Sequence, residues 1–308
     1  MIGKVAGSSA TVVRDVSNAS AGRDICTLSP SGSWRFAGEM RVSLAQPERG
    51  RIIVADLASG RAGKVTEWAG GGFASGTHAW SPDGTSLTYL VSDPSGLRWH
   101  LYQGGTDRVI ADLPPIPGRG VSNIQDDLFL EYAPDGRHLA LVETFATGGT
   151  GEKAPVQVRS ADGTLVYSAE SGRMGVWASQ PSRLYFRSLD GQVTRWDPTA
   201  GAALVASGII WVRPRASRDG TSIAYSSGGP AEIPDFHLFS VRENAVAPGG
   251  HSARAESRFI GPGLIWYVAA VPCQCPLTYL PGEPYVYEVS SGSESATRLL
   301  SVDDVWQR

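Results

Sequence analysis

A short segment recurs along the chain and restricts its fold more than any other feature. "WSPDGTSLTYLV" at 80–91 returns almost unchanged as "YAPDGRHLALV" at 132–142, and "ASRDGTSIAYSS" at 216–227 is a third relative. The Pro, Asp and Gly of this segment are typical of a tight turn. The residues after the turn are rich in β-branched and aromatic side chains, which favours a half-buried strand. The repeated unit is therefore predicted to be strand, turn, strand.

The spacing of the units predicts a β-propeller. The position of Ser81 recurs at intervals of 52, 52, 46, 38 and 40 residues by subtraction, at Ser29, Ser81, Ala133, Ser179, Ser217 and Ser257. Four-stranded propeller blades repeat every roughly 40 to 50 residues. We expect an all-β chain with almost no helix, a single domain over 1–308 with six four-stranded blades. Seven blades are the alternative, because "VDDVWQR" at 302–308 resembles the first strand of another unit.

Other parts of the units agree with this reading. The units at 176–201 and 255–271 lack the Pro-Asp-Gly turn and rest on the alternation of strands and turns. Later in the units, "VADLASG", "RWDPTAG" and "YEVSSGS" at 54–60, 195–201 and 287–293 each join a strand to a turn with a glycine. We interpret these three segments as the third strand of a blade turning into the fourth.

The Ser-Pro-Asp-Gly units resemble the PD40 or TolB-like variety of WD40-like β-propeller repeats. The segment "LIWYVAAVPCQCPLTYLPGEPYVYEVSSGSESA" at 264–296 is also similar to the last blade of uncharacterised extracytoplasmic propellers from high-GC bacteria. The resemblance implies an extracytoplasmic setting, whether periplasmic, secreted or surface-anchored, with the signal or anchor outside this chain. It does not define an activity, because propellers carry binding, scaffolding and several enzymatic chemistries.

Charge and hydropathy weigh against nucleic-acid binding and against a membrane span. The net charge is −3 and only three residues are Lys, so no basic stripe for nucleic acid forms in the sequence. The longest apolar runs, such as "GLIWYVAAV" at 263–271, are too short to span a bilayer. We expect a monomer whose partner is a protein or a small-molecule ligand.

No motif for catalysis or cofactor binding is present. The sequence has no Walker loop, G-x-S-x-G or H-E-x-x-H, and its five His residues are scattered. We predict no catalytic residue, no cofactor and no metal. Cys273 and Cys275 form a C-x-C that we interpret as loop thiols or a loop-stabilising disulfide, for which Cys26 is a further candidate.

The channel of the propeller is the predicted binding site. If the strand that ends at the repeat Ser lines this channel, residues two and four positions before the Ser share one face. This would gather Glu131, Trp177, Arg213 and Arg215, which could receive a carboxylate, a sugar or a peptide terminus. His78 occupies an inner-strand position too and completes the predicted ligand-binding set. The competing interpretation is a water-filled or ion-paired channel in which Glu131 only neutralises an Arg.

Several neighbouring residues have structural interpretations. Trp80 and Tyr132, which precede the repeat position, are expected to pack in the core, and Asp83, Asp135 and Asp219 are expected to be turn residues. The long insert at 111–131 is a predicted lid or recognition loop over one channel mouth.

Three functions are compatible with these observations. The leading hypothesis is an extracytoplasmic recognition module that binds a ligand or protein segment over the channel. The alternative is a propeller hydrolase or lyase acting on a saccharide or peptide, with Glu131 as general base and Arg213 or Arg215 stabilising an anion. The two Arg residues would keep Glu131 charged, which argues against a poised base. The third is a structural ring that positions another domain.

Overall fold

The computed structural model describes residues 2–4, 11–13, 25–28, 41–46, 51–56, 61–67, 74–93, 96–113, 128–143, 156–170, 172–179, 181–227, 232–273 and 279–297. Within these ranges the protein is all-β and contains no helix, as predicted. Accordingly, the described residues include no helix that could cross a membrane.

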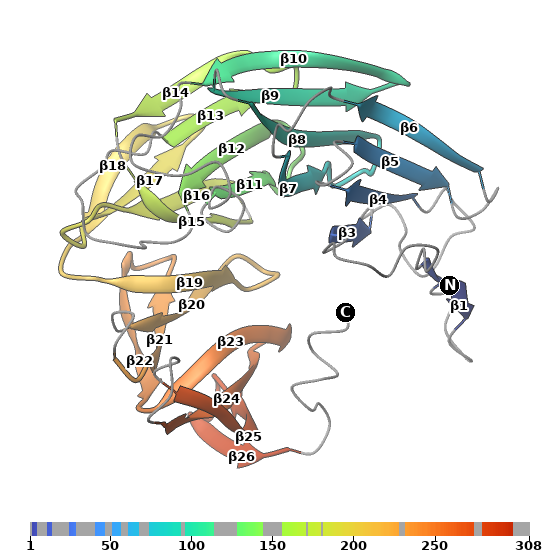
Figure 1. Ribbon diagram of the computed structural model, residues 1–308. Coiled ribbons are helices and arrows are strands. Elements are labelled where there is room, and N and C mark those ends of the chain that lie inside the picture. The colour runs from blue at the N-terminus through green and yellow to red at the C-terminus, as the bar shows by residue number, and fades with distance from the viewer. Residues whose placement is uncertain are drawn as a thin grey trace. The chain divides into compact units, whose positions relative to one another are not determined.

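Most of the described strands pair antiparallel with the next strand of the chain (Figure 1), and the exception is a short parallel pairing of β12 with β15 through Glu143 and Arg173. A two-stranded sheet pairs β1 (Ile2–Lys4) with β2 (Thr11–Val13). The described residues include four separate four-stranded sheets. The first comprises β3 (Ile25–Leu28), β4 (Arg41–Gln46), β5 (Arg51–Asp56) and β6 (Arg61–Glu67), and the second comprises β7 (Ala74–Trp80), β8 (Ser86–Asp93), β9 (Gly96–Gln103) and β10 (Thr106–Leu113). The third comprises β19 (Trp211–Ala216), β20 (Ser222–Ser227), β21 (Asp235–Ser240) and β22 (Ala245–His251), and the fourth comprises β23 (Arg254–Gly261), β24 (Leu264–Pro272), β25 (Tyr279–Glu288) and β26 (Ser293–Ala296).

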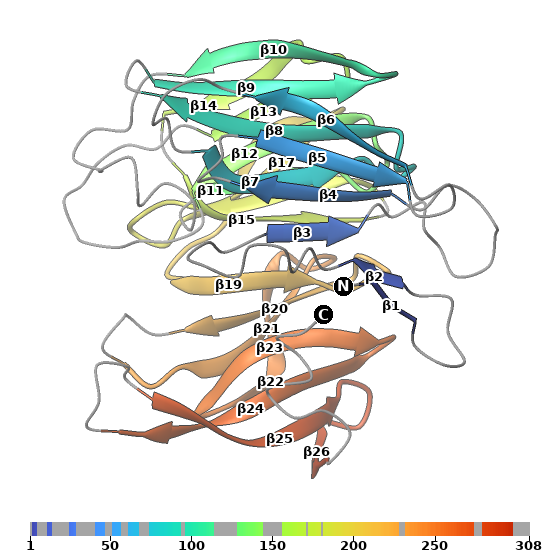
Figure 2. The same cartoon turned by 45° about the vertical axis from the view of Figure 1, so that its right-hand side comes forward.

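The remaining strands form one eight-stranded sheet, in which two runs of strands in chain order are joined by the pairing of β12 with β15. They are β11 (Leu128–Tyr132), β12 (His138–Glu143), β13 (Val156–Ser160) and β14 (Leu165–Ala169), followed by β15 (Arg173–Ala178), β16 (Arg183–Arg187), β17 (Val193–Asp197) and β18 (Gly201–Ala206). The segments read as a third strand turning into a fourth are confirmed, since β5 pairs with β6, β17 with β18 and β25 with β26. Figure 2 shows β23 to β26 side by side in chain order. The number of blades stays a prediction.

The chain divides into two compact units. Unit 1 comprises Met1–Leu141 and Gln157–Ser168, and unit 2 comprises Val142–Val156 and Ala169–Arg308. Within unit 1, β7 lies beside β11. Within unit 2, β15 lies beside β19, and β19 lies beside β23. These contacts bring β7 and β11 together in unit 1, and β15, β19 and β23 in unit 2. The single domain remains an expectation.

The aspartate side chains stabilise the predicted turns by hydrogen bonds. Asp219 Oδ1 accepts hydrogen bonds from Ser217 Oγ at 2.6 Å and from the Thr221 amide at 3.1 Å, and Gly220 donates its amide to the Ser217 carbonyl. Asp83 and Asp135 accept the equivalent amides, those of Thr85 and Arg137. These interactions confirm the three aspartates as turn residues. They also lower the pKa of Asp219, the hydrogen bond from Ser217 being the main cause.

The strand after the turn is more buried than the sequence predicts. In β8, Leu87 and Tyr89 face one side and Thr88 and Leu90 the other, yet all four are fully buried. The expected half-buried strand is thus wrong for these residues, because both faces of the sheet are covered. Thr88 is tolerated in this apolar environment because its hydroxyl donates to the His100 carbonyl at 2.9 Å.

The residues before the turns are core residues, as predicted. Trp80 is 6% exposed and Tyr132 is 7% exposed. Tyr132 belongs to a cluster of unit 1 that unites the second sheet with β11 and β12 through Leu90, Trp99, Leu101, Leu113, Leu130, Tyr132, Leu139 and Leu141. Burial raises the pKa of the Tyr132 phenol far above its usual range.

The position assigned to the sixth unit is corrected by the structure. Ser257 lies inside β23 instead of at its end, because the strand continues to Gly261 before the Gly-Pro-Gly turn. Gly220 and Gly263 have φ of 69° and 64° and occupy equivalent turn positions, 43 residues apart (263 − 220). Most of the first predicted turn, the middle of the insert at 111–131 and the 302–308 segment lie outside the described residues.

Candidate functional site

Three neighbouring strands of unit 2 carry a β-bulge at the same place. The register of β15, β19 and β23 against the following strand shifts between Arg173 and Val176, Val212 and Arg215, and Ala255 and Arg258. In each bulge one residue other than glycine has a positive φ: 53° at Met174, 49° at Arg213 and 60° at Glu256. Such residues cost roughly 1–3 kcal/mol each and cluster at functional sites, so this row of bulges is the first pointer to a site.

Direct contacts hold adjacent bulges together. Trp211 Nε1 donates a hydrogen bond to the Met174 carbonyl at 3.1 Å, which links β19 to the bulge of β15. Arg213 Nη1 donates to Glu256 Oε1, which links the bulge of β19 to that of β23. The Arg213 side chain is 50% exposed and that of Glu256 is 20% exposed. The ion pair is therefore reachable from solvent.

Two further guanidinium groups lie on the same two strands. Arg215 is exposed on β19, and Arg258 is half-buried on β23 with its guanidinium 5.6 Å from the centre of the Trp266 ring. Burial lowers the pKa of Arg258; the charge of Arg215 lowers it further, while Glu256 opposes both. We call Arg213, Arg215, Glu256 and Arg258 the arginine cluster; it carries three positive charges and one negative charge.

Two of the predicted ligand-binding residues meet in this cluster. Arg213 and Arg215 are both exposed on β19. Trp177 on β15 is 5% exposed and packs edge to face on Trp196, with ring centroids 6.1 Å apart. Trp177 therefore contributes to the core of unit 2, and its role in a binding site stays a prediction.

The other two predicted residues belong to unit 1. Glu131 is exposed on β11. His78 lies on β7 opposite Tyr89 of β8, and its side chain is outside the described residues. Neither observation tests a binding role for these residues.

Glu256 and Arg258 were missed by the sequence analysis. Anchoring the sixth unit on Ser257 selected Ala255, which is buried. Anchoring on the Gly-Pro-Gly turn finds the right residues, since Glu256 lies 43 residues after Arg213 (256 − 213) and Arg258 lies 43 after Arg215 (258 − 215). The turn glycine is thus the better signal, because its positive φ is imposed by the hairpin.

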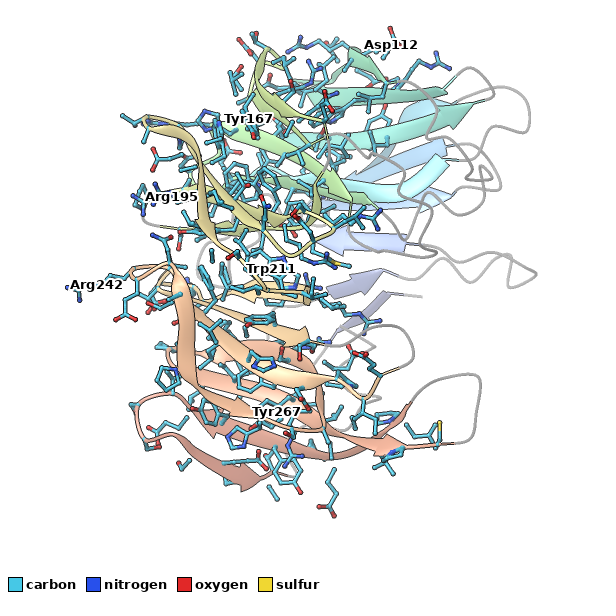
Figure 3. The ribbon with its side chains drawn as sticks, turned by 90° about the vertical axis from the view of Figure 1, so that its left-hand side faces the viewer. Asp112, Tyr167, Arg195, Trp211, Arg242 and Tyr267 are labelled. Carbon is cyan, nitrogen blue, oxygen red and sulfur yellow. The ribbon has the colours of Figure 1, made fainter. Side chains whose placement is uncertain are left out.

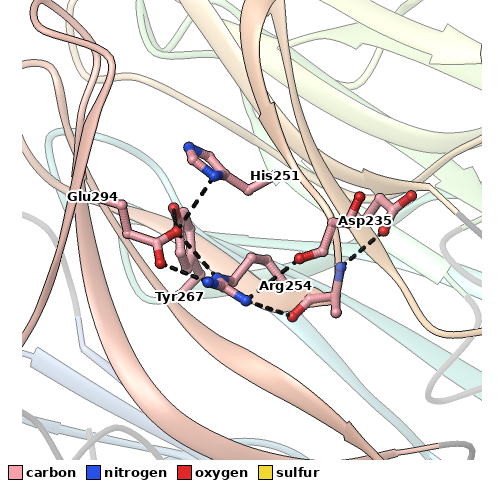
Figure 4. A network of polar contacts seen from close by, with 7 residues as sticks. Asp235, His251, Arg254, Tyr267 and Glu294 are labelled. Atoms are coloured by element: carbon pink, nitrogen blue, oxygen red, sulfur yellow. Dashed lines mark hydrogen bonds and ion pairs between the residues drawn. The ribbon is translucent and has the colours of Figure 1, made fainter.

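A second polar network lies in the last sheets of unit 2 (Figure 4). Glu294 accepts hydrogen bonds from Arg254 Nη2 at 2.5 Å, Arg254 Nε at 3.1 Å and Tyr267 Oη at 2.6 Å. Although burial alone would raise it, the pKa of Glu294 is lowered by these bonds and by the charge of Arg254. The Arg254 guanidinium also stacks 4.6 Å from the centre of the Tyr285 ring. Since these groups satisfy one another, we assign the network a structural role.

Cysteines and metal ligands are two further kinds of functional group. Cys273 is disulfide-bonded, so the free-thiol reading does not hold for this residue. No group of three or more His, Cys, Asp or Glu that could hold a metal ion occurs among the residues that the structure describes.

Comparison with known proteins identifies the fold. No protein-family model and no curated protein matches the sequence. A chain of the mitotic checkpoint complex aligns with a TM-score of 0.55 at 13% identity, covering 83% of this chain and 73% of that chain. Oligogalacturonate lyase in complex with manganese aligns with a TM-score of 0.52 at 12% identity, covering 96% and 82%. TolB from Acinetobacter baumannii aligns at 0.42 and 14% identity over 68% of this chain and 50% of its own, too weakly to carry an argument. The chain has a β-propeller fold.

Proposed function

We propose that the protein is an extracytoplasmic, monomeric β-propeller recognition module of six blades, which binds a ligand or a protein segment over its central channel. In this proposal β19 and β23 line the channel, and the arginine cluster forms part of its wall. The observation that carries the proposal is the ion pair of Arg213 with Glu256. It joins two strained bulges on neighbouring edge strands and remains open to solvent.

The compartment is supported by two observations. The Ser-Pro-Asp-Gly units resemble those of TolB-like propellers. In addition, Cys273 is disulfide-bonded, and disulfides persist mainly in oxidising compartments outside the cytoplasm.

The chemistry of the site favours binding over catalysis. Glu131, the residue that the hydrolase or lyase hypothesis needs as general base, is exposed. A carboxylate that takes up protons near neutral pH usually needs burial in an apolar environment. The arginine cluster contributes charge and hydrogen-bond donors, which suit recognition without a chemical step.

A thermal-shift screen tests the proposal. The purified protein is screened against peptides, oligosaccharides and divalent metal ions, and each hit is repeated with Arg215→Gln and Glu131→Ala. A ligand at 100 times its Kd raises stability by about 2.7 kcal/mol, and we expect such a shift to shrink in Arg215→Gln. Shifts that are identical in both variants and the unmutated protein, or the absence of any shift, would contradict the proposed site.

A further inference from the structure

The arginine cluster contains more hydrogen-bond donors than its own residues can satisfy. A guanidinium group has five N–H donors and no acceptor. Arg213 has Glu256 as its partner. Among the described residues, Arg215 and Arg258 have no hydrogen-bonded acceptor and no ion-pair partner.

The cost of this arrangement is highest at Arg258. Its guanidinium is half-buried over Trp266 and lies within electrostatic range of the like charge on Arg215. Burying a charge without a hydrogen-bonded counter-charge is unfavourable, and like charges add to the cost. Arg215 on β19 and Arg258 on β23 are thus two cations on neighbouring strands within electrostatic range of each other, and a bound anion would stabilise such a pair.

The geometry points to the class of ligand. We propose that Arg215 and Arg258 bind the two carboxylate groups of a dicarboxylate ligand, while Glu256 acts as an internal competitor that neutralises Arg213. The proposal rests on the proposed recognition function and adds the chemistry of what is recognised. Two carboxylates balance the net charge of the cluster, which is two positive charges, and planar carboxylates match the fork of donors on a guanidinium group.

Isothermal titration calorimetry at low ionic strength tests the inference with succinate and glutarate as probes and acetate as the monocarboxylate reference. We expect a dicarboxylate to bind at least about tenfold more tightly than acetate, since a second charge-assisted contact is gained. Raising the salt concentration to 0.5 M should weaken dicarboxylate binding, because salt screens the part of the attraction that is exposed to solvent.

Variants assign the binding to the cluster. Arg215→Gln and Arg258→Gln should each weaken dicarboxylate binding about tenfold. Glu256→Gln should tighten it several-fold, because it frees Arg213; an ion pair that serves the fold alone would leave binding unchanged or weaker. Arg242→Gln is the matched control, since Arg242 is an exposed Arg on the turn between β21 and β22 that projects away from the sheet (Figure 3). This control should bind like the unmutated protein.

The outcomes separate the inference from the function on which it rests. Binding of succinate or glutarate that is lost in Arg215→Gln supports the inference even if Arg258→Gln fails to fold, because Arg215 is exposed. The peptide acetyl-Glu-Glu-amide and digalacturonate then show whether the two carboxylates come from a peptide or a sugar acid. If a neutral sugar or a basic peptide binds instead and Arg215→Gln removes that binding, the dicarboxylate inference is overturned and the recognition function stands. If no dicarboxylate, neutral sugar or basic peptide binds, both the dicarboxylate inference and the proposed recognition function are overturned.

Discussion

Arg213 on β19 donates a hydrogen bond to Glu256 on β23, and both residues have a left-handed backbone conformation. The ion pair thus connects the strained positions of two sheets that are neighbours in unit 2. Strain of this kind is retained only where the surrounding structure imposes it. In this protein the bulges impose it, and they turn two charged side chains toward each other.

The strain at Arg213 predicts an unusual order of stabilities. Alanine keeps the strain of a positive φ whereas glycine relieves it, so Arg213→Gly should be about 1 kcal/mol more stable than Arg213→Ala. Urea unfolding curves measure the difference. At Arg215, which is not among the positive-φ residues, the order should be reversed. If Arg213→Ala is at least as stable as Arg213→Gly, the positive φ at Arg213 is not strained.

The turn glycines of two repeats should differ sharply in their tolerance of alanine. A Cβ at Gly220 would lie 1.7 Å from the Ser179 carbonyl oxygen, whereas one at Gly136 would meet Pro82 Cδ at an ordinary 3.6 Å. Both glycines have nearly the same positive φ. We expect Gly136→Ala to cost about 1–2 kcal/mol and Gly220→Ala about 3 kcal/mol or more, because the backbone must also move. Equal losses of stability in chemical denaturation would refute the close contact between the Gly220 turn and the backbone of Ser179.

Acid should remove one defined stabilising interaction. Burial would raise the pKa of Asp197, but hydrogen bonds from Arg183 Nε and from the amides of Thr199 and Ala200 outweigh it and lower the pKa to about 2. In the unfolded chain the pKa is near 3.8. The stabilisation by the carboxylate is therefore complete above about pH 5 and is lost as the pH falls through 3.8 toward 2.

The variant Asp197→Asn should be roughly 1–2 kcal/mol less stable than the unmutated protein at pH 7. The difference should shrink toward zero near pH 2, as measured by denaturant unfolding at several pH values. Glu243→Gln, at an exposed turn residue, should follow the pH dependence of the unmutated protein. A difference that does not change with pH would rule out the carboxylate as its origin.

The network around Glu294 should contribute more to the stability of the protein than an exposed acidic residue of the same sheet does. Glu294→Gln leaves the Arg254 guanidinium without its charged partner and weakens the contact with Tyr267, so we expect a loss of roughly 2 kcal/mol. Glu288→Gln, whose carboxylate accepts from the exposed hydroxyls of Ser290 and Ser291, should cost less than about 0.5 kcal/mol. Comparable losses in thermal unfolding would show that the network does not stabilise the sheet.

Parts of the site could be found from the sequence because they repeat. The Asp-Gly turn places Arg213 and Arg215 at set distances before Ser217, and strand alternation then predicts that both lie on one face. The same logic failed for the sixth unit, because its turn is Gly-Pro-Gly and the nearby Ser257 resembles the missing marker. Trp177 shows another limit, since alternation indicates a face but not whether the face is covered.

The sequence by itself determined the strands, the turns and their order, because Asp-Gly turns and alternating side chains are local features that need no distant contact. Only the tertiary structure decided which charges meet. Glu256 reaches Arg213 across 43 residues of sequence because a bulge in each strand turns the backbone to positive φ and the two edge strands lie side by side. Neither the bulge nor the pairing of sheets leaves a residue pattern, since both arise from the packing of one sheet on the next.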